Sequence, residues 1–276
     1  MARVRLTITL SPNVIKSLDS VIDKKTIRNR SHAIEYLLSQ QFLSKVTKVV
    51  ILAGGAGVKM QPLTLEMPKA LLPVRGEPLL FHTLRTLREA GLKDIILSVG
   101  NLGEKIQEHF GDGGKLGVRL TYVKQKKENG TAQPVRALKA LVGSDPFLLL
   151  YGDVLADINW VDLVNFHHTH DALATLAVTS VADTRGWGVV AMDGTRITRF
   201  MEKPDRAERS HLIFAGAAVL DPKVLDRIGA QTRSLEKEVL SELAKEKKIS
   251  GYNFSGAWFD VGTPEDFARA VSEWHA

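Results

Sequence analysis

Stretches typical of buried strands alternate with stretches typical of amphipathic helices along most of the chain, and this alternation restricts the fold more than any other feature. The strand-like runs occur at 48–53, 94–100, 118–123 and 147–152. Helical runs, each ending in glycine, separate them at 79–91, 102–111 and 133–143. Strands joined through helices lie parallel in one sheet, because the crossover returns the chain to the same end of the sheet. The sequence therefore predicts an α/β domain with a largely parallel sheet between helices.

The pattern changes after Asp171, where strand-like stretches become more frequent. They occur at 174–182, 187–200, 211–220 and 249–262, with helices expected from Pro222, Leu235 and Thr263. A histidine-rich run at 167–171 is expected at a helix end. Such a run is more typical of a solvated helix end than of a metal site, because an imidazolium is favoured beside the negative end of the helix dipole.

The first 44 residues form a separate pattern of one strand followed by two helices. Apolar and polar side chains alternate over residues 3–10, which is the period of a half-buried strand. Ser11 and Pro12 are typical of a helix start, and Ser31 is a candidate cap for the second helix. So short a segment cannot bury the apolar face of its strand alone, and we expect a second copy of the chain to supply the partner strand.

The same segment holds most of the net positive charge. The whole chain has a net charge of +6, whereas residues 1–46 carry eight Lys or Arg against three Asp or Glu, which leaves +5. The strand, the helices and the charge together resemble a ribbon-helix-helix DNA-binding module over residues 2–43, although the glycine usual between its helices is missing. The resemblance implies a dimer or higher oligomer that binds double-stranded DNA through Arg3, Arg5 and Thr7. The alternative is a dimerisation device with a solvated basic face.

Composition excludes several classes of protein. Apolar residues make up 44% of the 276 residues and charged residues 25%, as in ordinary globular proteins. No apolar run reaches about 18 residues, so we expect no membrane-spanning segment. The chain has no cysteine, which excludes disulfides and zinc–thiolate sites and makes a cytoplasmic location our expectation.

A run of small residues and two lysines follows the first strand of the larger domain: Gly54, Gly55, Ala56, Gly57, Lys59 and Lys69. Glycines allow a backbone to approach a ligand closely, and lysines favour an anionic ligand. The run is not the dinucleotide fingerprint, because Met60 stands where the third glycine is required. It is not a Walker P-loop either, because no Gly-Lys-Ser/Thr follows. The pattern indicates a phosphate-binding loop of another type.

This stretch resembles the signature of the sugar-phosphate nucleotidyltransferases, here running from Leu52 to Thr64 and from Pro68 to Val74. The resemblance extends over residues 47–276. It implies a glycosyltransferase-A-like, Rossmann-like α/β fold with a mixed, mostly parallel sheet flanked by helices. It also implies that a nucleotidyl group is transferred from an NTP to a sugar 1-phosphate with Mg²⁺ as cofactor, giving an NDP-sugar and pyrophosphate.

The resemblance assigns roles to residues in several segments that occur in the family's order. The nucleotide would be bound by Leu52, Ala53, Gly54, Gly55, Gly57, Lys69, Gln125, Gly130 and Thr131. The sugar phosphate would be bound by Gly152, Glu202, Lys203 and Gly216, and Mg²⁺ by Asp153 and Asp260. The catalytic residues would be Lys59, Lys69, Asp153 and Lys203. Asp153 and Asp260 also each end a predicted strand, where a doubly wound sheet places its ligands.

Three positions depart from the family pattern. Lys59 replaces the signature arginine, which keeps the charge but loses a bidentate contact with phosphate. Ala70 replaces a proline, and Phe214 stands where the family has an asparagine that contacts the sugar. These departures keep an alternative open, namely a DNA-binding regulator whose larger domain senses a nucleotide or sugar nucleotide without turning it over.

Base and sugar also stay open at this stage. The segments 187–204 and 235–240 lean towards mannose-1-phosphate guanylyltransferases. Gln125 leans instead towards the thymidylyl or uridylyl branch.

Overall fold

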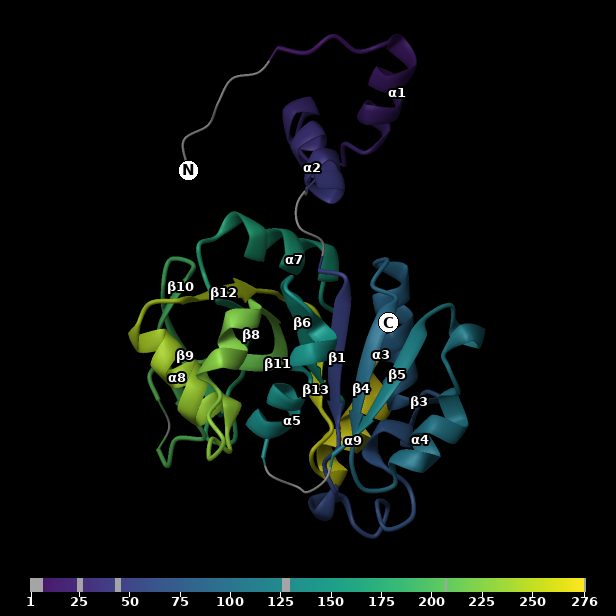
Figure 1. Cartoon of the computed structure of the whole chain (residues 1–276), viewed down its shortest axis with the longest axis vertical. Coiled ribbons are helices and arrows are strands. Elements are labelled where there is room, and N and C mark those ends of the chain that lie inside the picture. Colours follow the sequence, from purple (N-terminus) through teal and green to yellow (C-terminus); the bar gives the residue numbers. More distant parts are fainter. Residues whose placement is uncertain (1–6, 24–26, 43–45, 126–129, 207, 276) are drawn as a thin grey trace. The chain divides into compact units, whose positions relative to one another are not determined.

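The structure, a computed structural model, describes residues 7–23, 27–42, 46–125, 130–206 and 208–275, with the backbone alone at residues 35 and 38–42. The chain divides into two compact units, Met1–Lys45 and Val46–Ala276 (Figure 1). Within the described ranges, no helix is both long enough and apolar enough to cross a lipid bilayer.

The first unit contains two helices, α1 (Pro12–Ser20) and α2 (Arg30–Phe42). Leu18, Ile27 and Ala33 form its small core. Both helices confirm the sequence-based prediction, but the cap of the second helix was predicted wrongly. Asn29 caps α2 in place of Ser31, because its side-chain Oδ1 accepts a hydrogen bond from the backbone N of His32 at 2.9 Å.

The strand predicted at residues 3–10 is only partly covered by the structure. Residues 3–6 lie outside the described residues, and with them Arg3 and Arg5. Residues 7–10 are described and form no strand, and Thr7 among them is exposed. The predicted pairing needs a second copy of the chain, so a single chain offers this segment no partner.

A nine-stranded sheet forms the centre of the second unit (Figure 1). Its strands in spatial order are β5 (Arg119–Lys124), β4 (Asp94–Val99), β1 (Lys48–Ala53), β6 (Phe147–Tyr151), β11 (Leu212–Leu220), β8 (Ala174–Ser180), β12 (Ile249–Asn253), β10 (Arg196–Glu202) and β9 (Gly188–Asp193). Two short pairs accompany it, β7 (Val154–Ala156) with β13 (Trp258–Asp260) and β2 (Pro73–Val74) with β3 (Glu77–Pro78).

The sheet is mixed, and its parallel part is smaller than predicted. Strands β5, β4, β1 and β6 are parallel neighbours, as the alternation of strands and helices requires. Strand β11 lies antiparallel between β6 and β8, and β10 lies antiparallel to both β12 and β9. In the strand-rich half β12 is parallel to β8, whereas β11, β10 and β9 pair antiparallel, so the expectation of a mostly parallel sheet is wrong for this half.

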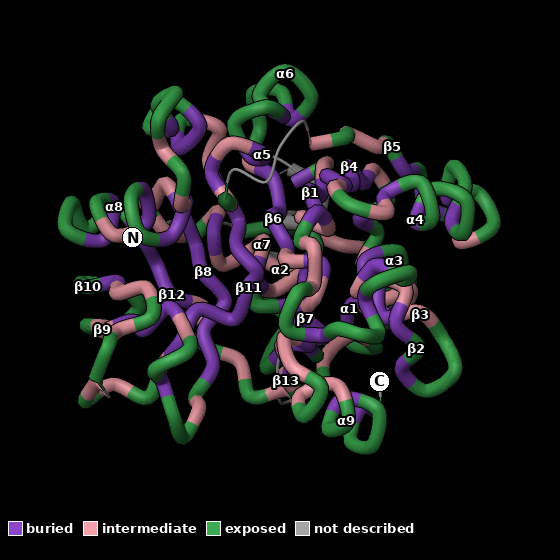
Figure 2. The backbone as a smooth tube through the Cα atoms, turned by 90° about the horizontal axis from the view of Figure 1, so that it is seen from below, coloured by how far each residue is buried: buried purple, intermediate pink, exposed green. Residues whose placement is uncertain are grey.

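Helices cover both faces of this sheet. One face is covered by α3 (Leu79–Glu89), α4 (Gly103–Phe110) and α7 (Trp160–Thr169), and the other by α5 (Ala132–Ala137), α6 (Lys139–Val142) and α8 (Ser241–Lys245). Val49 and Ile51 of β1 face the first layer, whereas Val50 faces the second. The central strands are therefore buried along their length, and the outward turns of the helices are exposed (Figure 2).

The remaining helical elements are short, apart from α9 (Pro264–Glu273), which packs with Trp274 on a third cluster of buried residues. Single turns of 3₁₀-helix occur at Val58–Met60, Lys69–Leu71 and Gly114–Leu116, a longer 3₁₀-helix spans Pro222–Arg227, and a π-helix, η5, spans Leu235–Leu240. Three predicted elements are each divided: the helix at 133–143 into α5 and α6, the strand at 187–200 into β9 and β10, and the strand at 249–262 into β12 and β13.

The histidine run at the end of α7 is solvated only in part, because Thr169 and Asp171 are exposed whereas His167 is buried. His167 is only 5% exposed, and its Nδ1 lies 2.9 Å from Oγ1 of Thr175. Burial lowers the pKa of His167 to about 4, so the ring is neutral at pH 7. The described residues contain no group of three or more His, Asp or Glu that could hold a metal ion.

Candidate active site

The carboxyl ends of β1 and β6 lie side by side, because these strands pair in parallel from Val49–Leu148 to Leu52–Tyr151. The backbone N of Gly152 donates to the O of Leu52 at 2.9 Å, which keeps the two strand ends together. A cavity of about 420 Å³, the main hollow, opens at this end of the sheet. Its lining consists of Leu52, Gly54, Gly55, Gln125, Gly130, Thr131, Pro134, Tyr151 and Asp153. Three segments that are far apart in the sequence, 52–55, 125–134 and 151–153, therefore meet at one cavity.

Gln125 forms one wall of the main hollow. Its backbone N donates to the O of Val99 at 2.8 Å, and its Nε2 donates to Oγ of Ser98 at 3.0 Å. A Cβ atom at Gly54 would overlap the amide group of Gln125. A side chain at position 54 would therefore displace this amide group, and with it the hydrogen bond to Ser98.

Gly130 and Thr131 form the facing wall, where the chain enters α5. Gly130 has φ +71°, and a Cβ atom there would overlap the carbonyl O of Arg233. The hydroxyl of Thr131 donates to Oε2 of Glu236 at 2.6 Å and accepts a hydrogen bond from the N of Leu235 at 2.9 Å. This wall is thus fixed to the start of η5, more than 100 residues later in the chain.

A cation and a carboxylate meet at the side of the main hollow. Nζ of Lys69 donates to Oδ2 of Asp153, and their side chains are 17% and 27% exposed. A smaller cavity of about 20 Å³ lies beside them and is lined by Leu52, Ala53, Gly55, Lys69, Ala70, Gly152 and Asp153. Lys69 and Asp153, which the resemblance assigned to one catalytic set, therefore lie together although 84 residues separate them in the sequence.

Asp260 lies next to Asp153 because of strand pairing. Asp260 is opposite Val154 in the antiparallel pair of β13 and β7, and the N of Val261 donates to the O of Asp153 at 2.8 Å. Burial and the negative charge of Asp153 together raise the pKa of Asp260 to about 7, although the positive charge of Lys69 counteracts part of this increase. The ion pair with Lys69 therefore does not fully offset the negative charge of the two carboxylates.

These carboxylates fit a divalent cation. Two hard oxygen ligands that repel each other are stabilised by a bound Mg²⁺, which prefers carboxylate and phosphate oxygens and retains waters. Among the described residues no third His, Asp or Glu joins them in a metal-binding group. A cation held by Asp153 and Asp260 would therefore take its other ligands from water and substrate.

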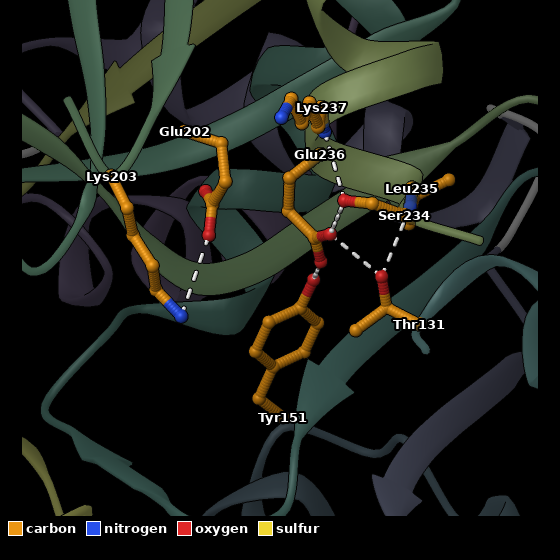
Figure 3. A network of polar contacts seen from close by, with 8 residues as sticks. All are labelled: Thr131, Tyr151, Glu202, Lys203, Ser234, Leu235, Glu236 and Lys237. Atoms are coloured by element: carbon orange, nitrogen blue, oxygen red, sulfur yellow. Dashed lines mark hydrogen bonds and ion pairs between the residues drawn. The ribbon is translucent and has the colours of Figure 1, made fainter. Parts of the chain in front are cut away.

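Glu202 and Lys203 lie at the end of β10 (Figure 3). Nζ of Lys203 is 3.6 Å from Oε1 of Glu202. Burial raises the pKa of Glu202, and the nearby carboxylate of Glu236 raises it further. Lys203 has φ +46°, a conformation that a lysine seldom adopts, and its N donates to the O of Trp187 at 2.9 Å. Strained backbone of this kind is concentrated at functional sites.

Phe214 and Gly216 lie on β11, beside Tyr151. The ring of Phe214 meets that of Tyr151 edge-on at 5.7 Å between centroids, so an apolar contact stands where the family's pattern has an amide. Gly216 has φ +77° and lines a separate cavity of about 10 Å³ that Tyr151 also borders. Gly216 therefore does not line the main hollow.

Lys59 and Gly57 lie away from the main hollow. Lys59 is exposed in the 3₁₀ turn that follows Gly57, and neither residue lines one of the three cavities described above. Gly57 has φ +67° and its O accepts a hydrogen bond from the hydroxyl of Thr64 at 2.7 Å.

Sequence analysis missed Glu236 as a site residue. Glu236 is only 6% exposed, and its Oε1 accepts a hydrogen bond from the hydroxyl of Tyr151 while Oε2 accepts from Thr131 and Ser234 (Figure 3). Tyr151, which lines the main hollow, was missed as well. The available signal was the segment Leu235–Leu240, which sequence analysis related to the family without taking a site residue from it. Glu236 and Glu238 both stand in this segment, and the sequence does not show which of them is buried in the site.

Comparisons with known proteins agree with this geometry. The model of the family described as nucleotidyl transferase matches residues 48–276. The mannose-1-phosphate guanylyltransferase catalytic subunit beta of Drosophila melanogaster is 36% identical over 229 residues, which cover 82% of this chain and 62% of that protein. The mannose-1-phosphate guanyltransferase beta-B of Xenopus laevis is 36% identical over 229 residues, which cover 81% of this chain and 63% of that protein. The chain thus spans somewhat less than two thirds of the length of these relatives.

Solved structures share the fold. A protein from Bacillus anthracis, assigned as a glucose-1-phosphate thymidylyltransferase and solved with a sucrose, superposes with a TM-score of 0.74 at 28% identity, covering 82% of this chain and 94% of that one. A UDP-glucose pyrophosphorylase complexed with UDP-glucose superposes with a TM-score of 0.71 at 23% identity, covering 83% of this chain and 98% of that one. At the latter identity the likeness concerns the fold alone.

Proposed function

Because the chain belongs to the nucleotidyl transferase family, we propose that it transfers a nucleotidyl group from an NTP to a sugar 1-phosphate, with GTP and mannose 1-phosphate as its substrates. The observation that carries the proposal is the main hollow, where the glycine loop, the walls at Gln125 and Thr131, and the ion pair of Lys69 and Asp153 converge. The names of the relatives favour this substrate pair and favour turnover over sensing.

The nucleotide would occupy the main hollow. Its base would lie between Gln125 and the wall formed by Gly130 and Thr131, and its phosphates would lie along the loop after β1. Leu52, Ala53, Gly54, Gly55 and Gly57 supply backbone to that loop, and a backbone without side chains can approach phosphate closely. Lys69 adds a positive charge beside these phosphates.

The sugar phosphate would approach from the side of β10 and β11. Lys203 would bind its phosphate, Glu202 would accept hydrogen bonds from sugar hydroxyls, and Gly152 and Gly216 would present their backbone to the sugar phosphate. A phosphate oxygen of the sugar phosphate attacks the α-phosphorus of the NTP, and the bond from that phosphorus to the pyrophosphate oxygen breaks. Positioning and neutralisation of charge supply most of the catalysis, because no covalent nucleophile is required.

Lysines would neutralise the charge that develops during this displacement. Lys203 acts on the incoming phosphate, and Lys59 would act on the departing pyrophosphate from its exposed turn. Asp153 and Asp260 would hold Mg²⁺, which when bound offsets the negative charge of the phosphates. The shared site of the two carboxylates suits this role, since Asp260 ionises with difficulty without a cation.

A test combines the purified protein and Mg²⁺ with each NTP and a panel of sugar 1-phosphates, and measures released pyrophosphate. We expect release with GTP and mannose 1-phosphate to exceed that with other pairs, and Asp153→Asn to remove it. Release with a different pair would correct the assignment of substrates. No release with any pair would refute the proposed function.

We also propose that residues 1–45 pair two chains and bind double-stranded DNA. Among their described side chains, Leu18, Ile27 and Ala33 form a buried cluster and Ile8, Val14 and Leu37 are exposed, so a second copy would cover apolar surface that these residues present. Arg3, Arg5 and Thr7 from both chains would then lie on one face of a paired ribbon and enter a major groove. The concentration of positive charge in this segment favours a polyanionic partner.

DNA binding can be separated from dimerisation by its dependence on salt. Binding of duplex DNA should weaken with a log–log slope of about −0.9 per phosphate neutralised, and Arg3→Ala with Arg5→Ala should flatten this slope. A dimer, verified by sedimentation, that binds no DNA at low salt would reduce the segment to a dimerisation device.

A further inference from the structure

Glu236 is a buried carboxylate to which the mechanism above gives no role. It is 6% exposed, and no ion pair joins it to a lysine or arginine within the described ranges. A carboxylate away from water is costly unless hydrogen-bond donors satisfy its oxygens. Here three hydroxyl groups do so, those of Thr131, Tyr151 and Ser234 (Figure 3). An apolar residue in the same space would cost less free energy of desolvation, so the presence of a carboxylate here indicates a functional role.

The three hydroxyl groups come from different parts of the proposed active site. Thr131 belongs to the wall that faces the nucleotide, and Tyr151 stands at the end of β6, two residues before Asp153. Ser234 belongs to the element of Glu236 itself, where its Oγ also accepts a hydrogen bond from the N of Lys237 at 3.0 Å. Thr131 and Tyr151 are thus joined through one side chain, and Ser234 serves the helix start.

The sugar-phosphate side reaches the same carboxylate. Tyr151 packs edge-on against Phe214, and the carboxylate of Glu202 is near enough to Glu236 for their charges to interact. Glu236 lies in the first turn of the π-helix η5, an uncommon element that is frequently found at functional sites. A shift of Glu236 would therefore change the surroundings of both proposed substrates.

We propose that Glu236 is a positioning residue that couples the two substrates, linking the nucleotide wall at Thr131 to the sugar-phosphate side at Tyr151 and Glu202. Each substrate then binds more tightly when the other is present, because the first to bind fixes the hydrogen bonds that the second requires. The inference rests on the proposed function for the identity of the substrates, but the coupling is measurable without turnover.

The experiment titrates the full-length protein with GTP by calorimetry in EDTA, with and without saturating mannose 1-phosphate. The ratio of the two dissociation constants is the coupling factor, and we expect about 5-fold or more for the wild type. Glu236→Gln keeps the shape of the side chain but supplies an amide donor to one of the hydroxyl groups, so its coupling factor should fall to about 1. Thr131→Val and Tyr151→Phe should each reduce the factor, and their combination should reduce it no further.

Two variants on the same element serve as controls. Glu238→Gln removes a charge from the carboxylate that accepts hydrogen bonds from the N of Arg233 and the N of Ser234, both at 2.8 Å. Ser234→Ala removes the helix cap and one donor to Glu236, but leaves the link between Thr131 and Tyr151. We expect both variants to lower the unfolding temperature while keeping the coupling factor of the wild type.

Three outcomes would overturn the inference: a wild type without coupling, an unchanged factor in Glu236→Gln, or an equal loss in either control. In parallel, initial rates are measured with Mg²⁺ while the concentrations of both substrates are varied. The KM values give the same ratio, separately from any effect on kcat. Coupling without pyrophosphate release would refute the proposed function alone. Release without coupling would refute the inference alone.

Discussion

Asp260→Asn should make the metal-free protein more stable and at the same time remove its activity. The pKa of Asp260 rises from 3.8 to about 7 on folding, because the carboxyl group is buried beside Asp153. As the pH increases, Asp260 loses its proton in the unfolded chain before it does so in the folded protein. The free energy of unfolding therefore decreases between about pH 4 and about pH 7. The loss is complete above about pH 7 and amounts to about 4 kcal/mol, at about 1.4 kcal/mol for each pH unit.

The substitution to Asn keeps the shape of the side chain and removes its charge. In EDTA, the variant should therefore exceed the wild type in free energy of unfolding by about 4 kcal/mol at pH 8 but by only about 2 kcal/mol at pH 5. Urea denaturation at both pH values measures this difference, and thermal unfolding provides a check. For a domain of this size each kcal/mol corresponds to about 2–4 °C in Tm.

Addition of Mg²⁺ should make the wild type more stable than Asp260→Asn. A cation that binds the folded state stabilises the wild type and not a variant that lacks one of its two carboxylates. Pyrophosphate release by the variant should fall by at least about 100-fold. The reasoning would be refuted by a variant less stable than the wild type in EDTA at pH 8, or by equal stabilisation of both proteins by Mg²⁺.

Four further predictions concern the lysines, a buried histidine and the first unit. Lys203→Ala should raise the KM for the sugar phosphate by at least about 10-fold, whereas Lys69→Ala should mainly weaken nucleotide binding; the opposite pattern in initial rates would exchange their roles. Lys59→Arg should increase kcat, since a guanidinium binds phosphate bidentately, and an unchanged rate would remove Lys59 from the catalytic set. Burial lowers the pKa of His167 to about 4. When the pH is lowered from 7 to 5, the free energy of unfolding of the wild type relative to His167→Gln should therefore fall by about 2 kcal/mol. A difference in urea denaturation that stays constant over this pH range would contradict the prediction. Deletion of residues 1–45 should weaken self-association in sedimentation experiments while pyrophosphate release continues, because the second unit contains the whole proposed active site.

Local pattern was sufficient to predict most elements of the second unit. The strands β1, β4 and β6 and the helices α3 and α4 lie where the apolar periodicity placed them. This periodicity is a property of a few neighbouring residues, because it depends only on which side of a helix or strand faces the core. For the loop after β1, glycines and lysines also indicate a phosphate site from local pattern alone, and this site stays a prediction.

Pairing between distant segments could not be predicted in this way. Strand β11 lies antiparallel between β6 and β8, and nothing in its apolar sequence distinguishes that position from a parallel one. His167 has the sequence context of a solvated helix end but is buried against Thr175 of β8. Both outcomes depend on which surfaces remain free after the other elements have packed.

In the candidate active site, too, some residues could be predicted from the sequence and others could not. The sequence by itself determined that Asp153 and Asp260 follow apolar strand patterns, and its resemblance to the family predicted Gln125 as a site residue, because each belongs to a motif of adjacent residues. Only the tertiary structure decided that Glu236 joins Thr131, 105 residues before it, to Tyr151, 85 residues before it. A buried carboxylate is stabilised by donors that come near it in space, and the separation of those donors along the chain leaves no periodic pattern in the sequence.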